Sequence, residues 1–112
     1  MLSENEYVKY DALGLASLVR AGDVTSMELL DIAIARVERF NPTINAVVTS
    51  MYDEARAQVA QAGSNRGTFA GVPFLLKDLR ASYKGVRSSI GNAFMSAVPD
   101  FDSVITTRFK DA

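Results

Sequence analysis

The sequence predicts a mixed α/β fold within one domain. Helical periodicity fills most of the first 62 residues, whereas residues 45–49 and 71–79 are β-branched or continuous apolar runs that favour strands. These elements do not alternate regularly, so a simple doubly wound sheet is not expected. The chain has 112 residues, of which 48% are hydrophobic and 22% charged, a balance typical of a globular domain rather than a disordered segment.

Two capping patterns predict the first two helices. Asp11 is a suitable N-cap for a helix over residues 12–20, and Gly22 can adopt the left-handed conformation that ends it. Thr25 and Glu28 have the spacing of a capping box, in which each side chain accepts a hydrogen bond from the other residue's backbone. A longer helix is therefore expected to follow Thr25.

The longer helix should bury one face and end at a proline. Its apolar residues recur every three or four positions, and we expect Arg36, Arg39 and Asp31 on the solvated side. Asn41 precedes Pro42, and a residue before proline avoids the helical region. The helix is therefore predicted to end there.

The middle of the chain predicts a connector, a helix and a loop. Residues 45–49 favour a strand or an extended connector. A helix is expected from about Tyr52 to Ala62, with Gly63 as its stop, followed by a loop over residues 64–67.

The last third predicts a buried strand, a loop and a final helix. Residues 71–79 form an apolar run with Pro73 near its beginning, a pattern that predicts a strand buried on both faces. Residues 82–92 are rich in Gly and Ser and favour a turn or an ordered active-site loop. Asp102 or Ser103 should open the final helix.

The composition excludes several kinds of chemistry. With no histidine and no cysteine, the chain cannot supply a Ser-His-Asp triad, a thiol nucleophile or a Cys/His zinc site. Its formal charge of −1 gives no positive field for a nucleic acid. No secretory signal and no membrane-spanning segment are recognisable, so we expect a cytoplasmic protein with no membrane partner and no cofactor.

Lys77 is the main candidate for chemistry. It ends an apolar run, and an ammonium removed from water tends to lose its proton and become a base. In a chain without histidine, a neutral lysine could deprotonate a serine hydroxyl. Alternatively, Lys77 simply reaches solvent or pairs with a carboxylate. Asp78 should face the other way in a strand, so we expect it to anchor the following loop rather than to pair with Lys77.

Two further pairs are weaker candidates. Ser88 and Ser89 could combine with a lysine as nucleophiles, although serines in a glycine-containing loop usually serve the turn. Asp100 and Asp102 could contribute to a hard-cation site, but such sites need several converging oxygens and a helix cap already explains Asp102. No metal site is therefore predicted.

The segment GVPFLLKDL at residues 71–79 closely resembles the first motif of the amidase signature family. Similarity to the same family extends to TSMEL at residues 25–29, to NPTINA at residues 41–46, and to residues 85–92 with the helix that follows. The resemblance thus covers almost the whole chain, in order and with compatible spacing. It implies helices packed on a mixed sheet, of which this chain would hold the N-terminal helices and the first strands.

The resemblance also implies an activity and a role for one residue. Such enzymes hydrolyse carboxylic amides through an acyl-enzyme, using a Ser, cis-Ser, Lys triad, and Lys77 matches the lysine. Both family serines belong to a Gly/Ser-rich stretch beyond the matched region, where this chain has stopped. Residues 1–112 are therefore expected to be the N-terminal part of one amidase domain, inactive alone and prone to self-association.

One departure and two alternatives accompany this resemblance. Where many relatives read TTxGS, this chain has Ser88-Ser89-Ile90-Gly91-Asn92, which lacks the final hydroxyl. A related possibility is a protein that transfers amide nitrogen to an acyl-tRNA as part of an amidotransferase. A different class is a non-enzymatic helical module that binds a partner through its apolar helix faces.

Overall fold

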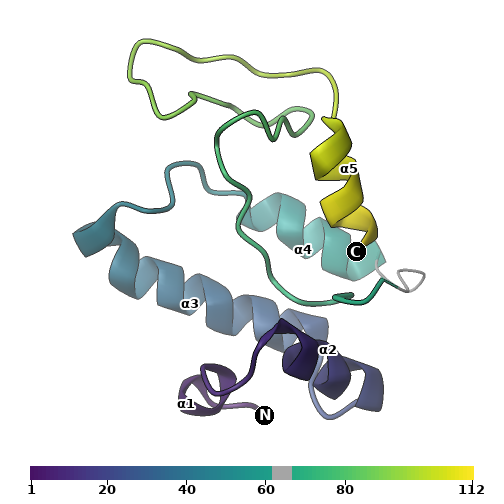
Figure 1. Ribbon diagram of the computed structural model, residues 1–112. Coiled ribbons are helices and arrows are strands. Elements are labelled where there is room, and N and C mark those ends of the chain that lie inside the picture. Colours follow the sequence, from purple (N-terminus) through teal and green to yellow (C-terminus); the bar gives the residue numbers. More distant parts are fainter. Residues whose placement is uncertain (62–66) are drawn as a thin grey trace. The chain divides into compact units, whose positions relative to one another are not determined.

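A computed structural model describes residues 1–61 and 67–112 (Figure 1). The regular structure of these residues is helical, in the order α1 (Glu4–Tyr7), α2 (Ala12–Ala21), α3 (Ser26–Ile44), α4 (Tyr52–Gln61) and α5 (Val104–Asp111). The chain divides into two compact units, Met1–Pro73 and Phe74–Ala112. None of the described helices is long and apolar enough to cross a membrane.

Helix α1 was not expected from the sequence, although the signal for it was present. Ser3 and Glu6 form a capping box, in which the Ser3 amide donates to the Glu6 carboxylate at 2.9 Å. The short helix is then held to α3 by Glu4, whose carboxylate pairs with Arg36 at 2.8 Å and also with Arg39. These arginines therefore join two helices; Arg39 is exposed, as expected for the solvated side, and Arg36 is partly buried.

Helix α2 and the start of α3 follow the predicted caps. The Asp11 carboxylate accepts from the Gly14 amide at 2.8 Å, and Gly22 ends α2 with a φ of 80°. At α3, the Thr25 amide and hydroxyl donate to the Glu28 carboxylate at 2.8 and 2.9 Å. Local hydrogen bonding thus fixes both helix starts, as the capping patterns predicted.

The end of α3 differs from the prediction, because the helix continues past Pro42 to Ile44. The turn that follows is closed by Asn41, whose side-chain amide donates to the Val47 carbonyl at 2.9 Å and whose oxygen accepts from the Val47 amide at 2.8 Å. Asn45 then ends the helix in the left-handed conformation, with a φ of 49°. This double hydrogen bond stabilises the turn after the helix, although Pro42 itself donates no helix hydrogen bond.

Residues 45–49 form a connector rather than a strand, and α4 follows. Helix α4 begins at Tyr52 as expected, and the predicted end at Ala62, the Gly63 stop and most of the 64–67 loop lie outside the described residues. Two contacts hold α4 beside α3 in Figure 1: Arg56 pairs with Asp31 at 2.8 Å, and the Tyr52 hydroxyl donates to Glu38 at 2.7 Å.

The first unit has a hydrophobic core formed where α2, α3 and the segment after α4 meet. Its buried members are Leu15, Val24 and Leu29, and the partly buried Val72 packs against them. Gly71 makes this approach possible: its φ is 84°, and a Cβ there would overlap the hydroxyl of Ser26. The glycine that begins the 71–79 motif is therefore required for packing.

The second unit consists of a long irregular segment followed by α5. The Ser103 hydroxyl accepts from the Thr106 amide at 3.4 Å, so Ser103 is the N-cap, as one of the two predicted alternatives. Within this unit, the rings of Phe74 and Phe109 lie 4.7 Å apart.

The predicted strands are not found among the described residues, whose only β-type pairing is the isolated antiparallel bridge between Ser88 and Ala97. The expectation that residues 71–79 are buried on both faces was also wrong, since Phe74 and Leu75 are each 66% exposed. A strand forms only against a neighbouring strand, and the described residues supply none beside this segment.

Candidate functional site

Lys77 lies in the irregular segment that opens the second unit, directly before a tight turn over residues 78–80. The Lys77 carbonyl accepts from the Leu79 amide at 2.8 Å, and Arg80 has a φ of 65°. The residue is exposed, and in the described part of the chain its ammonium makes no ion pair. Of the two simple alternatives, the geometry therefore matches a lysine that reaches solvent rather than one paired with a carboxylate.

Asp78 anchors the following loop, as predicted. One carboxylate oxygen accepts from the Ser88 hydroxyl at 2.6 Å, and the other accepts from the Ser89 hydroxyl at 2.8 Å and the Ser89 amide at 3.0 Å. The hydrogen bond from Ser88, with further ones from Ser89 and the Ile90 amide, lowers the pKa of Asp78 to about 2, against the opposing effect of burial. Asp78 is therefore an ionised anchor throughout the neutral range.

Ser88 and Ser89 serve the loop rather than forming an evident nucleophile. Ser89 is buried, and both hydroxyls donate to Asp78, a carboxylate that is too acidic to act as a base near neutral pH. Ser88 also forms the backbone bridge to Ala97, with hydrogen bonds of 2.8 and 2.9 Å. The structure thus brings together Asp78 and the two serines, and it joins neither serine to Lys77 by a hydrogen bond within the described residues.

Asp102 is occupied by protein donors on both oxygens. The Lys84 amide donates to one oxygen at 2.8 Å and the Lys110 ammonium to the other at 2.5 Å. These two donors lower the pKa of Asp102, Lys110 having the larger effect. In the described ranges, no group of three or more carboxylates is placed to hold a metal ion. Pairing between Asp102 and a lysine eight residues away was not evident from the sequence.

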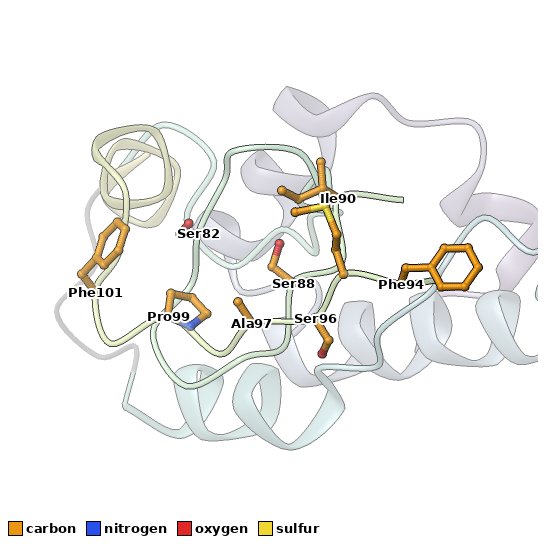
Figure 2. A pocket seen from close by; sticks show the side chains of 9 residues that line it. Ser82, Ser88, Ile90, Phe94, Ser96, Ala97, Pro99 and Phe101 are labelled. Atoms are coloured by element: carbon orange, nitrogen blue, oxygen red, sulfur yellow. The ribbon is translucent and has the colours of Figure 1, made fainter. Parts of the chain in front are cut away.

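A hollow of about 510 Å³ lies in the loop between Ser82 and Phe101 (Figure 2). Its lining is apolar apart from serine hydroxyls and contains no ionisable side chain: Ser82, Ser88, Ile90, Phe94, Met95, Ser96, Ala97, Pro99 and Phe101. The loop is held in shape by the bridge between Ser88 and Ala97 and by the Gly85 amide, which donates to the Pro99 carbonyl at 2.9 Å. No pattern in the sequence predicted this hollow.

Comparison with known proteins identifies the family. The family model Amidase matches residues 28–112, and the chain belongs to the amidase family. It is 46% identical over 96 residues to a lipoamidase of Enterococcus faecalis, covering 85% of this chain and 13% of the relative. It is 45% identical over 75 residues to a 6-aminohexanoate-cyclic-dimer hydrolase of Pseudomonas sp. (strain NK87), covering 67% of this chain and 15% of the relative.

A third relative extends the family similarity to amidotransferases. The chain is 34% identical over 101 residues to the A-type component of the glutamyl-tRNA(Gln) amidotransferase of Synechococcus sp. (strain CC9605), covering 84% of this chain and 20% of the relative. No solved structure gives a significant match. The chain spans between 13% and 20% of the length of these three relatives.

Proposed function

We propose that this chain is the N-terminal part of a single amidase domain that hydrolyses carboxylic amides, with Lys77 as its catalytic base. The observation that carries the proposal is the position of Lys77: it lies inside the family-matched range and directly before an anchored turn, and no carboxylate among the described residues pairs with it. The hydrolases among the relatives support the reaction class.

In the proposed reaction, neutral Lys77 accepts a proton, through a bridging serine, from a nucleophilic serine. That serine attacks the amide carbonyl, the C–N bond breaks, and the lysine returns the proton to the departing amine. Water then hydrolyses the acyl-enzyme. We propose that both serines and the oxyanion donors belong to the rest of the domain, so that this chain alone is inactive.

We propose that the rest of the domain supplies a partner strand for this chain, and that the chain associates with itself when that partner is absent. Residues 72–77 would become a strand of a mixed sheet when a neighbouring strand is present. Without it, apolar side chains such as Phe94, which is 98% exposed, favour self-association. Light scattering after size-exclusion chromatography tests this: we expect a dimer or larger assembly, and a clean monomer at high concentration would contradict it.

We propose a cytoplasmic location, without nucleic-acid or membrane partners.

A chimera tests the role of the lysine. This chain replaces the matched segment of the Enterococcus faecalis lipoamidase, and hydrolysis of lipoyl and simple amides is compared with that of the Lys77→Ala chimera. We expect the Lys77→Ala change to lower kcat by about 10²- to 10⁴-fold, the usual contribution of general acid–base catalysis. Turnover that is unchanged by Lys77→Ala would contradict the proposed role.

A second candidate is the A-type component of an amidotransferase, favoured by the 34% identity with the Synechococcus protein. It shares the proposed amide chemistry and differs in the acceptor of the released nitrogen. In hydrolysis the acyl group passes to water and the nitrogen of a primary amide leaves as free ammonia, which a coupled ammonia assay detects. Incorporation of the amide nitrogen into an acyl-tRNA in the presence of the other amidotransferase components, in place of free ammonia, would favour the amidotransferase.

A further inference from the structure

We propose that Asp78 is a positioning residue: by holding Ser88 and Ser89, its carboxylate fixes the backbone from which Lys77 projects. This inference rests on the proposed function of Lys77, and it assigns to the Asp78 and serine contacts a role in placing the base rather than only in shaping a loop.

The strength of the anchor comes from the number of donors that meet one carboxylate. The hydroxyls of Ser88 and Ser89 and the Ser89 amide donate to it at 2.6 to 3.0 Å. The Ser89 amide also lies 3.2 Å from the carboxylate oxygen that accepts from Ser88. Hydrogen bonds to an ionised acceptor are stronger than neutral ones. A carboxylate that accepts from three donors on both oxygens has little freedom to move away from the loop.

The loop side of the anchor is itself held. The Ser88 amide donates to the Ala97 carbonyl at 2.8 Å, and the Ala97 amide donates back to the Ser88 carbonyl at 2.9 Å. Ser88 thus joins Asp78 to a bridged pair of segments through its side chain and its backbone. The carboxylate is attached to a braced loop rather than to a free one.

The other side of the anchor is the turn that follows Lys77. The Leu79 amide donates to the Lys77 carbonyl at 2.8 Å, which places Asp78 at the centre of a three-residue turn. This hydrogen bond ties the Lys77 carbonyl to the backbone on the other side of Asp78, so the two residues cannot move independently. Fixing the Asp78 side chain therefore fixes the backbone at Lys77.

The groups that face the Asp78 carboxylate are hydrogen-bond donors rather than charged partners. They are the hydroxyls of Ser88 and Ser89 and backbone amides, and no ion pair joins Asp78 to its neighbours Lys77 or Arg80 in the described part of the chain. A catalytic base must stay within hydrogen-bond reach of the proton it accepts, and a displacement of about 1 Å can cost about 10²-fold in rate.

The decisive variant lies far from Lys77 in the sequence. In a ¹⁵N-labelled sample of the 112-residue chain, Ser88→Ala combined with Ser89→Ala removes two donors and changes no residue next to the lysine. We expect the amide signals of both Asp78 and Lys77 to move, while the signals of the first unit remain. The matched control, Ser88→Thr combined with Ser89→Thr, keeps both hydroxyls and should leave the Lys77 signal in place. An unmoved Lys77 signal in the alanine pair would overturn the proposal.

A kinetic comparison separates failure of this inference from failure of the proposed function. In the lipoamidase chimera, we expect the alanine pair to lower kcat about 10²-fold with KM little changed, and the threonine pair to restore it. If Lys77→Ala abolishes turnover but the alanine pair leaves kcat unchanged, the positioning role alone is overturned. If Lys77→Ala leaves turnover intact, the proposed function fails whatever the serine variants do. If the alanine pair prevents folding, the single change Ser88→Ala with its Ser88→Thr control gives the same two readouts.

Discussion

Among the described residues of the first unit, 1–61 and 67–73, the buried side chains are apolar, whereas in residues 74–112, all of which the structure describes, they are the hydroxyl-bearing Ser89 and Thr106. The first unit buries Leu29 completely and encloses it with other aliphatic residues. The second unit is organised by two carboxylates, Asp78 and Asp102, that collect hydrogen bonds from distant parts of their own unit.

This difference shows where each unit obtains its stability. Apolar burial gives the first unit its own driving force for folding. Hydrogen bonds contribute only about 1 kcal/mol each, net of solvation, so a unit built on them depends on further packing. The exposed apolar side chains of the second unit, such as Phe94 and Val104, provide surface for that packing. The candidate catalytic segment lies in the unit that depends on it.

The largest expected effect tests the core of the first unit. Leu29→Ala should lower the free energy of unfolding by about 2–5 kcal/mol, because it removes a fully buried side chain and leaves a cavity. Leu13, which is 50% exposed, is the matched control, and its change to Ala should have little effect. Urea unfolding followed by circular dichroism measures both. Equal losses for the two variants would show that the first unit has no separate core.

The next effect concerns glycines with positive φ in the two units. Gly71→Ala in the first unit combines backbone strain with overlap against Ser26, so we expect a loss of about 1–3 kcal/mol. Gly85→Ala in the second unit, with a φ of 78° and open space around the added Cβ, should show backbone strain alone. Thermal unfolding compares them. A larger loss for Gly85→Ala would contradict the close packing at Gly71.

A smaller effect is expected at the start of α3. Thr25→Ala removes the hydroxyl that accepts from the Glu28 amide at 3.1 Å, and such changes cost about 1 kcal/mol. Thr25→Ser retains the hydroxyl and should be nearly neutral. Urea titration of the two variants decides the matter, because equal destabilisation would mean that the methyl group of Thr25, rather than its hydroxyl, stabilises the helix.

The smallest effect is the response of the second unit to acid through Asp102. The hydrogen bond from Lys110 lowers the pKa of this carboxyl in the folded chain, so its stabilisation is present above the ordinary value of 3.8 and is lost as pH falls through the lower folded value. For a partly exposed pair the loss should not exceed about 1 kcal/mol. The Lys84 amide signal should follow this titration in NMR spectra. Asp102→Asn should abolish the response, and a Lys84 titration that persists in this variant would assign it to another group.

Local patterns in the sequence predicted several structural features because their partners lie within a few residues. Asp11 and Thr25 cap helices with amides three residues away, and Ser103 does the same. The anchoring role of Asp78 was predicted from its position after a lysine and before a serine-containing loop. Its serine partners lie ten and eleven residues away, so their identity required the structure.

Features that depend on distant partners could not be predicted. Helix α3 continues past Pro42 to Ile44, and Asn41 closes the next turn against Val47; a proline pattern carries no information about that contact. Glu4 joins α1 to α3 across 32 positions of sequence. Residues 71–79 have the composition of a buried strand, but composition cannot supply the neighbouring strand that pairing requires. Lys77 as a candidate base was predicted, and its catalytic role stays a prediction.

The central claim is that this chain contributes the base of an amidase site without its nucleophile, and amide hydrolysis by the chain itself tests this most directly. A panel of simple amides and anilides is incubated with the 112-residue chain and with its Lys77→Ala variant, beside the lipoamidase chimera as a positive control. We predict turnover by the chimera and none by either form of the chain. Turnover by the chain that disappears with Lys77→Ala would contradict the claim, because Ser88 or Ser89 would then be the nucleophile.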